Sequence, residues 1–190
     1  MKIVLASKSP RRKEILENIF KNLTITNPSF KEKFKKNQIP ENVCMDIAQK
    51  KGLSVSDNFP YSYIISADTI VFANNEILGK PNNKSQANKY LKLLSNNSHE
   101  VYTGVSLINK DKNINELFFD QTEVFFNKIS NKEISFYINN YNPFDKAGSY
   151  GIQDWSKVFI KKINGCFYNV VGFPLPKFYK LFANDLRLIK

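Results

Sequence analysis

The chain has 190 residues, of which 42% are hydrophobic and 14% aromatic, enough apolar material for one sizeable core. Its 28 Lys and Arg residues against 17 Asp and Glu residues give a formal net charge of +11, which favours an anionic partner without distinguishing a nucleotide, a nucleic acid or a membrane surface. The single histidine, His99, and the two isolated cysteines, Cys44 and Cys166, exclude a thiolate zinc site or a histidine cluster within one chain.

The first predicted elements are a strand over residues 3–5 and a helix with Ser9 as N-cap and Pro10 in its first position. Its apolar face is formed by Ile15, Leu16, Ile19 and Phe20. Arg11 and Arg12 fall in the first turn, where each cation opposes the helix macrodipole at a cost of roughly 0.3–1 kcal/mol. We therefore expect an anion to bind here, and we expect removal of either arginine to leave folding intact or slightly improved.

Apolar periodicity and turn residues predict the remaining elements. In chain order they are a short strand after Phe20, a helix stopped by Gly52, a hairpin over 61–81, a helix opened by Ser85, strands over 99–108 and 115–126, a helix starting at Ser130, an irregular segment over 141–155, a hairpin at Asn164–Gly165 and a helix over 176–182. Strands adjacent in sequence, mixed with separated helices, predict an α/β fold with a mixed central sheet.

Asp68 carries the strongest chemical signal, because it lies within a run that otherwise suits a buried strand. A carboxylate taken out of water costs several kcal/mol unless a metal, a cation or hydrogen bonds receive it. With Ser66 and Thr69 beside it, Asp68 is a candidate base or metal ligand; a structural carboxylate that caps a loop is the alternative. If Asp68 is the base, we expect Asp68→Asn to lose activity and, without metal, to melt at or above the wild-type temperature.

Two further segments carry candidate binding residues. Lys80 lies in a Gly-Lys-Pro turn, and the glycines of segment 145–153 space small backbone around Lys146 and Gln153. Neither a P-loop nor a GxGxxG pattern is present in the sequence. Cations from several segments, the helix N-terminus near Ser7 and a carboxylate together suit a polyphosphate ester, with Mg²⁺ as the usual cation for oxygen ligands.

Six segments stand in order along the chain: LASKSPRR (5–12), SADTIVF (66–72), LGKP (78–81), HEVYTGV (99–105), DKAGSYGIQ (145–153) and INGCFYNVVGFPL (163–175). In this order and at this spacing they resemble the Maf family of nucleoside triphosphate pyrophosphatases, which is similar in fold to inosine triphosphate pyrophosphatases. The resemblance runs nearly end to end. It implies one domain over residues 1–190, in which helices flank a mixed twisted central sheet and a cleft lies between two lobes.

The resemblance also implies an activity: hydrolysis of a nucleoside triphosphate between the α- and β-phosphates, with a divalent cation, Mg²⁺ or Mn²⁺. Asp68 matches the family's proton acceptor, and Asp68 and Glu32 would hold the metal. The residues expected to bind substrate are Ser7, Arg11, Arg12, Glu32, Lys51, Thr69, Lys80, Lys146 and Gln153. Arg12, Thr69 and Gln153 match positions associated with base choice, and ADT together with YGIQ resembles the branch that acts on dTTP and UTP.

The chain departs from the family pattern at several positions. Lys8 adds a cation next to the expected triphosphate, and Asn142 replaces an acid before a proline. Asp154 and Trp155 stand where the family tends to have small glycines, so we expect a base pocket that is narrower or differently shaped.

Alternatives to the enzyme are a non-catalytic basic protein that binds nucleotides or nucleic acid through phosphate contacts and stacking, and a nucleotide sensor without turnover. No RNP1 run or helix-turn-helix pattern is present in the sequence, so no specific nucleic-acid partner is expected. No apolar run approaches the ~18–20 residues of a membrane span, and no signal-peptide pattern is visible, so we expect a cytoplasmic protein without a membrane partner. The family tends to form homodimers, and the aromatic content is compatible with one.

Overall fold

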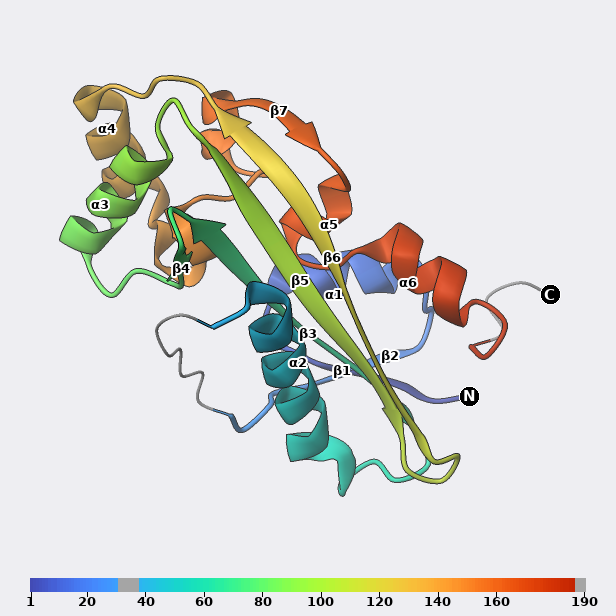
Figure 1. Ribbon diagram of the computed structural model, residues 1–190. Helices are drawn as coiled ribbons and strands as arrows, with labels where there is room; N and C mark the ends of the chain where they lie inside the picture. The colour runs from blue at the N-terminus through green and yellow to red at the C-terminus, as the bar shows by residue number, and fades with distance from the viewer. Residues whose placement is uncertain (31–37, 187–190) are drawn as a thin grey trace.

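The computed structural model describes residues 1–30 and 38–186, and within them seven strands form one sheet (Figure 1). The strands are β1 (Ile3–Ala6), β2 (Leu23–Thr26), β3 (Tyr63–Ala73), β4 (Glu76–Leu78), β5 (Ser98–Asn109), β6 (Ile114–Phe126) and β7 (Ile160–Asn164). They lie in the order β2-β1-β3-β5-β6-β7, and β4 pairs with β3. Since β1 is parallel to β2 and β3 while the other pairs are antiparallel, the predicted mixed sheet is confirmed.

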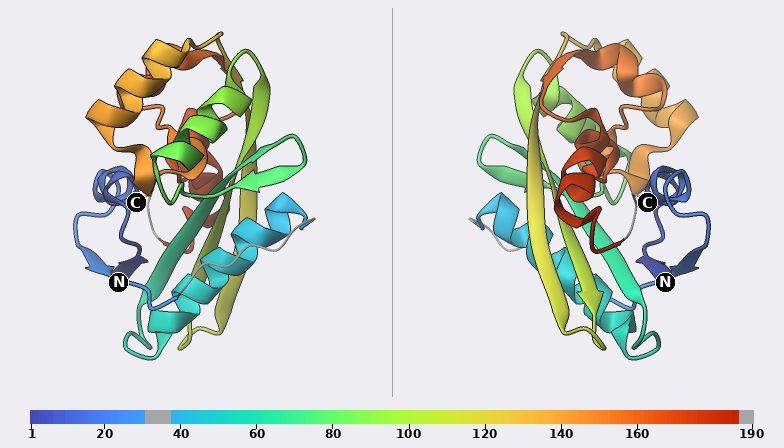
Figure 2. Two further views of the ribbon diagram at one scale, coloured as in Figure 1. Left: turned by 90° about the vertical axis from the view of Figure 1, so that its left-hand side faces the viewer. Right: turned by 90° about the vertical axis from the view of Figure 1, so that its right-hand side faces the viewer.

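Helices cover both faces of this sheet, as the two side views in Figure 2 show. They are α1 (Pro10–Glu17), α2 (Pro40–Ser56), α3 (Lys84–Leu94), α4 (Asn131–Tyr141), α5 (Phe167–Val171) and α6 (Leu175–Phe182), with short 3-10 turns at Pro143–Asp145, Ala147–Ser149 and Trp155–Phe159. Helix α2 packs on one face, where Val55 belongs to a hydrophobic cluster with Val4, Ile64 and Ile108. The remaining helices pack on the opposite face, because alternate residues of a strand point to opposite sides.

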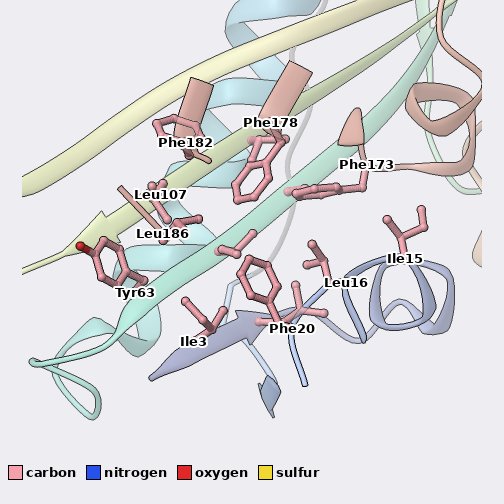
Figure 3. Close-up of a cluster of buried hydrophobic side chains, with 14 of the residues drawn as sticks. Ile3, Ile15, Leu16, Phe20, Tyr63, Leu107, Phe173, Phe178, Phe182 and Leu186 are labelled. Atoms are coloured by element: carbon pink, nitrogen blue, oxygen red, sulfur yellow. The ribbon is translucent and has the colours of Figure 1, made fainter. Parts of the chain in front are cut away.

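The face opposite α2 carries two separate hydrophobic clusters. In the first, Ile15 and Leu16 of α1 and Phe178 and Phe182 of α6 converge on one end of β3 and β5 (Figure 3). In the second, α3 and α4 pack on the other end of the same two strands, around Val71 and Val101. The expected two lobes are these two clusters, and their boundary falls in the middle of β3.

Local sequence signals define several boundaries correctly. The Ser9 hydroxyl accepts a hydrogen bond from the Arg12 backbone N–H at 3.4 Å, and Ser130 forms a capping box with Glu133 at the start of α4. Asn74 and Asn75 turn the β3–β4 hairpin, both with positive φ. Both cysteines are free.

Three expected boundaries are wrong, and tertiary contacts explain two of them. Helix α2 continues past Gly52, because that glycine lies against Ser66 and Ile108 and lets the helix lie close to the strands. Asn164–Gly165 ends β7 without starting a second strand: the Cys166 N–H donates to Thr122 Oγ1 at 3.0 Å, and α5 follows. Helix α3 is capped by Asn83, two residues before the expected Ser85, because the Asn83 side chain accepts from the Gln86 N–H.

Candidate active site

A gap along one edge of β3 brings Asp68 and Thr69 into one cavity. On this edge β1 pairs with residues 63–65 and β4 pairs with residues 71–73, so within the described chain residues 66–70 have no strand partner there. Asp68 faces α2 and Thr69 faces α1, since neighbours on a strand point to opposite faces. At the open edge both line the same cavity of about 430 Å³.

The cavity gathers every predicted site residue that the structure describes. They are Ser7, Arg11, Arg12, Lys51, Asp68, Thr69, Lys80, Lys146 and Gln153. Lys8 lines it too, as its departure from the family pattern suggested. Glu32 lies outside the described residues. The segments concerned come from both lobes, so the cavity is the expected cleft, while the role of each residue remains a prediction.

Asp68 forms a buried ion pair with Lys51 of α2. The Lys51 Nζ and Asp68 Oδ1 atoms lie 2.6 Å apart, and the two residues are only 8% and 4% exposed. The ammonium stabilises the ionised carboxylate, the form that accepts a proton. The pair also changes one expectation: Asp68→Asn removes the charge that compensates Lys51, so it is expected to lower stability, not preserve it.

Arg12 is a buried structural residue as well as a cavity residue. Its Nε donates to the Gly172 carbonyl at 2.8 Å, its Nη2 to Thr69 Oγ1 at 2.9 Å, and its Nη1 weakly to Ser7 Oγ at 3.5 Å. These bonds join the first turn of α1 to β3 and to the end of α5. We therefore revise the expectation for Arg12 and predict that its removal lowers stability, because the macrodipole conflict is smaller than charged hydrogen bonds of this kind.

Arg11 forms an ion pair with a carboxylate of the protein itself, that of Asp145. Its Nη1 lies 3.1 Å from Asp145 Oδ2, and Lys146 Nζ lies 2.7 Å from Asp145 Oδ1. Burial raises the pKa of Asp145, but hydrogen bonds and charges from Lys146 and Arg11 outweigh burial and lower it. Asp145 also lines the cavity. Sequence reasoning did not single it out, although it opens the DKAGSYGIQ segment.

Asp154 and Trp155 do not line the cavity, so their side chains do not narrow it directly, and a base pocket of different shape stays a prediction. The Asp154 carboxylate accepts from the Tyr137 hydroxyl at 3.1 Å and lies 3.5 Å from Lys146 Nζ. The Trp155 ring stacks on Tyr137 and Tyr141 of α4, with interplanar angles of 20°. Together the two side chains therefore connect the loop that carries Gln153 to α4 and to Lys146.

Two other titratable residues near the cavity are unsuited to catalysis. His99 Nε2 lies 2.7 Å from the Tyr150 hydroxyl, and burial lowers the pKa of His99 to about 3, so the ring is neutral. Burial and the Asp68 charge raise the pKa of Cys44 to about 12, which keeps its thiol protonated. His99 is thus a packing and hydrogen-bonding residue.

Three residues that sequence reasoning missed hold Thr69 and Arg12 in place through hydrogen bonds: Thr103, Asn169 and Gly172. Thr103 and Asn169 are fully buried polar side chains, and the Gly172 carbonyl receives Arg12 Nε. The only signal in the sequence was their position inside two of the six family segments. Their contacts depend on β3, β5 and α5 being brought together.

The charges of the cavity suit a polyanion. Among residues 1–30 and 38–186, six cationic side chains, from Lys8, Arg11, Arg12, Lys51, Lys80 and Lys146, line the cavity together with two carboxylates, Asp68 and Asp145. Within residues 1–30 and 38–186, no three His, Cys, Asp or Glu side chains are grouped closely enough to hold a metal unaided. A cation held by one carboxylate together with a ligand's own oxygens fits this donor set.

A cationic cleft at the edge of a mixed sheet fits a small phosphorylated anion in charge and size. A model of the Maf family, described as Maf-like protein, matches residues 2–184. The chain belongs to the Maf family, which confirms the resemblance carried by the six segments.

Two relatives of high identity agree with this assignment. A dTTP/UTP pyrophosphatase of Carboxydothermus hydrogenoformans is 41% identical over 180 residues, covering 95% of this chain and 96% of the relative. A dTTP/UTP pyrophosphatase of Clostridium perfringens strain 13 is 44% identical over 189 residues, covering 97% of each chain. Among solved structures, a HAM1 protein from Coxiella burnetii is 16% identical with a TM-score of 0.48, over 66% of this chain and 73% of that one.

Proposed function

We propose that the protein hydrolyses nucleoside triphosphates, preferably dTTP and UTP, to the nucleoside monophosphate and pyrophosphate. The observation that carries the proposal is the buried Asp68–Lys51 pair, which opens into a cavity ringed by cations. The relatives named dTTP/UTP pyrophosphatase, at 41% and 44% identity over nearly the whole chain, support the same activity. The proposal treats residues 1–190 as one domain.

The triphosphate would bind to cations that come from different segments. Arg11 lies in the first turn of α1, Lys80 follows β4, and Lys146 precedes the second 3-10 turn. In the structure Arg11 and Lys146 hold Asp145, so a phosphate would compete with that carboxylate for them. Ser7 would add a hydroxyl at the same end of the cavity.

Asp68 would act as the base. It accepts a proton from a water molecule that attacks phosphorus, and the α–β anhydride bond breaks with its electron pair leaving on pyrophosphate. The Lys51 ammonium pairs with the carboxylate and orients it. A divalent cation, Mg²⁺ or Mn²⁺, would neutralise phosphate charge when bound; Asp68 would hold it together with Glu32, which lies outside the described residues.

The base would lie near Thr69 and Gln153, with Arg12 holding Thr69 in place. Short donors and acceptors of this kind suit the edge of uracil or thymine, and a base that leaves them unpaired is rejected.

The described residues contain no helix long and apolar enough to span a membrane. A cytoplasmic location, a homodimer and the absence of a specific nucleic-acid partner belong to the proposal.

Pyrophosphate release from a panel of triphosphates tests the proposal. Purified protein is incubated with dTTP, UTP, CTP, dGTP or ATP in the presence of Mg²⁺ or Mn²⁺. The Asp68→Asn variant, purified by the same procedure, controls for contaminating phosphatases. We expect release to be fastest from dTTP and UTP. Nucleotide binding without turnover would identify a sensor, and RNA binding without turnover would identify a nucleic-acid binder. A purine triphosphate with the highest kcat/KM would overturn the base preference.

A further inference from the structure

Thr103 lies directly behind the base-binding Thr69. The two residues are cross-strand neighbours on β5 and β3, and their Oγ1 atoms are 3.0 Å apart. Thr69 is half-buried and lines the cavity, whereas Thr103 is fully buried. The inference that follows rests on the proposed function, because it concerns which base the cavity accepts.

Counting protons gives the direction of each hydrogen bond in this cluster. The Thr103 hydroxyl has one proton, which it donates to the Asn169 carbonyl at 2.9 Å. Thr103 can therefore only accept from Thr69, and the Thr69 proton points inward. Arg12 Nη2 also donates to Thr69 Oγ1, since a guanidinium cannot accept. Thr69 is left with one lone pair for a ligand.

The reverse arrangement is less favourable. If Thr103 donated to Thr69, its oxygen and the Asn169 carbonyl oxygen would lie 2.9 Å apart without a proton between them. Among residues 1–30 and 38–186, Thr69 would then have only the Gly172 carbonyl, at 3.5 Å, for its own proton, and that carbonyl already accepts from Arg12 Nε at 2.8 Å. Asn169 cannot easily move away, because its Nδ2 donates to the Val101 carbonyl and to Thr122 Oγ1.

We propose that Thr103 is a specificity-determining residue, which makes Thr69 a hydrogen-bond acceptor toward the nucleobase. Such a site takes a base with a ring N–H at the contacted edge. Uracil and thymine carry a proton on N3, whereas the N3 atom of cytosine is an acceptor. Thr103 therefore makes the cavity select uracil and thymine over cytosine, two ring types of the same size.

The test compares UTP with CTP in Thr103→Val, which keeps the shape of the side chain and removes its hydroxyl. Thr103→Ser, which keeps the hydroxyl, is the matched control. We expect wild type and Thr103→Ser to favour UTP by at least about 10-fold in kcat/KM, and Thr103→Val to reduce that ratio by roughly 10-fold, because Thr69 can then turn its proton toward the base. A purely structural role would lower both rates and leave the ratio unchanged.

Calorimetric titration with UMP and CMP supplies a readout that does not need turnover. If no triphosphate is cleaved, the proposed function fails, while the ratio of UMP to CMP affinity still tests Thr103. A folded Thr103→Val protein with the wild-type ratio overturns the inference. So does wild-type protein that binds CMP as tightly as UMP, a result that stands even if Thr103→Val and a second variant, Thr103→Ala, both fail to fold.

Discussion

At the scale of single residues, neighbours decide what each charged side chain does. Asp68 and Lys51 share a buried ion pair, whereas Arg11 and Asp145 meet at the partly exposed edge of the cavity. Removing one partner of a buried pair leaves a charge in a poorly solvated place, while a partly exposed partner is solvated by water. Two predictions follow from this contrast.

Asp68→Asn is expected to lose both activity and stability. The rate of pyrophosphate release should fall about 10²–10⁴-fold, because an amide cannot take up the proton. The free energy of unfolding without metal should fall by about 1–3 kcal/mol, because Lys51 loses its carboxylate. Urea titration and a pyrophosphate assay measure the two effects. Asp57→Asn is the control, since Asp57 forms an exposed ion pair with Lys110. Normal activity per folded Asp68→Asn molecule would remove Asp68 from the mechanism.

Variants of the two arginines in the first turn of α1 should differ: loss of Arg11 should mainly weaken substrate binding, and loss of Arg12 should mainly lower the free energy of unfolding. Arg11→Ala is expected to raise KM for dTTP and to change the free energy of unfolding by less than about 1 kcal/mol. Arg12→Ala should lower stability by about 2–3 kcal/mol, since buried charged hydrogen bonds to Gly172 and Thr69 are lost. Steady-state kinetics and urea unfolding of both variants check this. Equal stability of the two variants would contradict it.

At the scale of elements, the approach of α2 to the sheet depends on glycines. A Cβ on Gly104 of β5 would lie 2.4–2.5 Å from backbone atoms of Cys44 and Met45 in α2. Gly104 is also the β5 partner of Asp68 in the strand register. The missing side chain therefore lets the helix that carries Lys51 lie directly over the strand that carries Asp68.

Gly104→Ala is accordingly expected to push α2 away from the sheet. Backbone atoms cannot yield locally, so the free energy of unfolding should fall by about 3 kcal/mol, and activity should fall with it. Gly52→Ala is the milder comparison: its Cβ would lie 2.8 Å from Ser66 Oγ and 2.9 Å from Ile108 Cδ1, and these side-chain ends can shift further than backbone atoms can, so its loss of stability should be smaller. A gain in helix propensity of up to about 1 kcal/mol offsets that shift. If Gly52→Ala is the more damaging variant in urea titration, the packing argument is wrong.

At the scale of the whole molecule, the lobe that holds α3 and α4 contains a buried titratable group. His99 packs edge-on against Phe126 and Tyr150, and burial lowers its pKa to about 3 from the ordinary value of 6.5. Below pH 6.5 the unfolded chain therefore binds a proton that the folded protein does not. The contribution of neutral His99 to the free energy of unfolding is therefore fully present above pH 6.5, and it is lost progressively as the pH decreases toward 3.

This linkage should cost about 2 kcal/mol of stability at pH 5 relative to pH 8. His99→Gln keeps a hydrogen-bonding group for Tyr150 and cannot titrate, so its loss of stability between the two pH values should be smaller by about that amount. Urea unfolding of both proteins at pH 8 and pH 5 measures the difference, because contributions from carboxylates are common to both. The same pH dependence in both proteins would show that His99 is not responsible.

The sequence by itself determined the features that depend on residues close together in the chain. Caps such as Ser9 and Ser130, the Asn74–Asn75 turn and the apolar periodicity of the long strands define most elements locally. The six motifs were enough to indicate the family, and Asp68 was recognisable as a carboxylate inside a strand pattern. The helix end expected at Gly52 and the hairpin expected at Asn164–Gly165 do not form, because contacts with distant strands outweigh the local preference of these residues.

Only the tertiary structure decided how the charges and protons of the cavity are arranged. Arg11 and its partner Asp145 are 134 residues apart in the chain, and no local pattern links them. The direction of the Thr69 proton depends on Thr103, Asn169 and Arg12, which come from three further segments. Ion pairs and hydroxyl orientations are set by which groups folding brings within about 3 Å, and that distance is a property of the assembled sheet, not of any one segment.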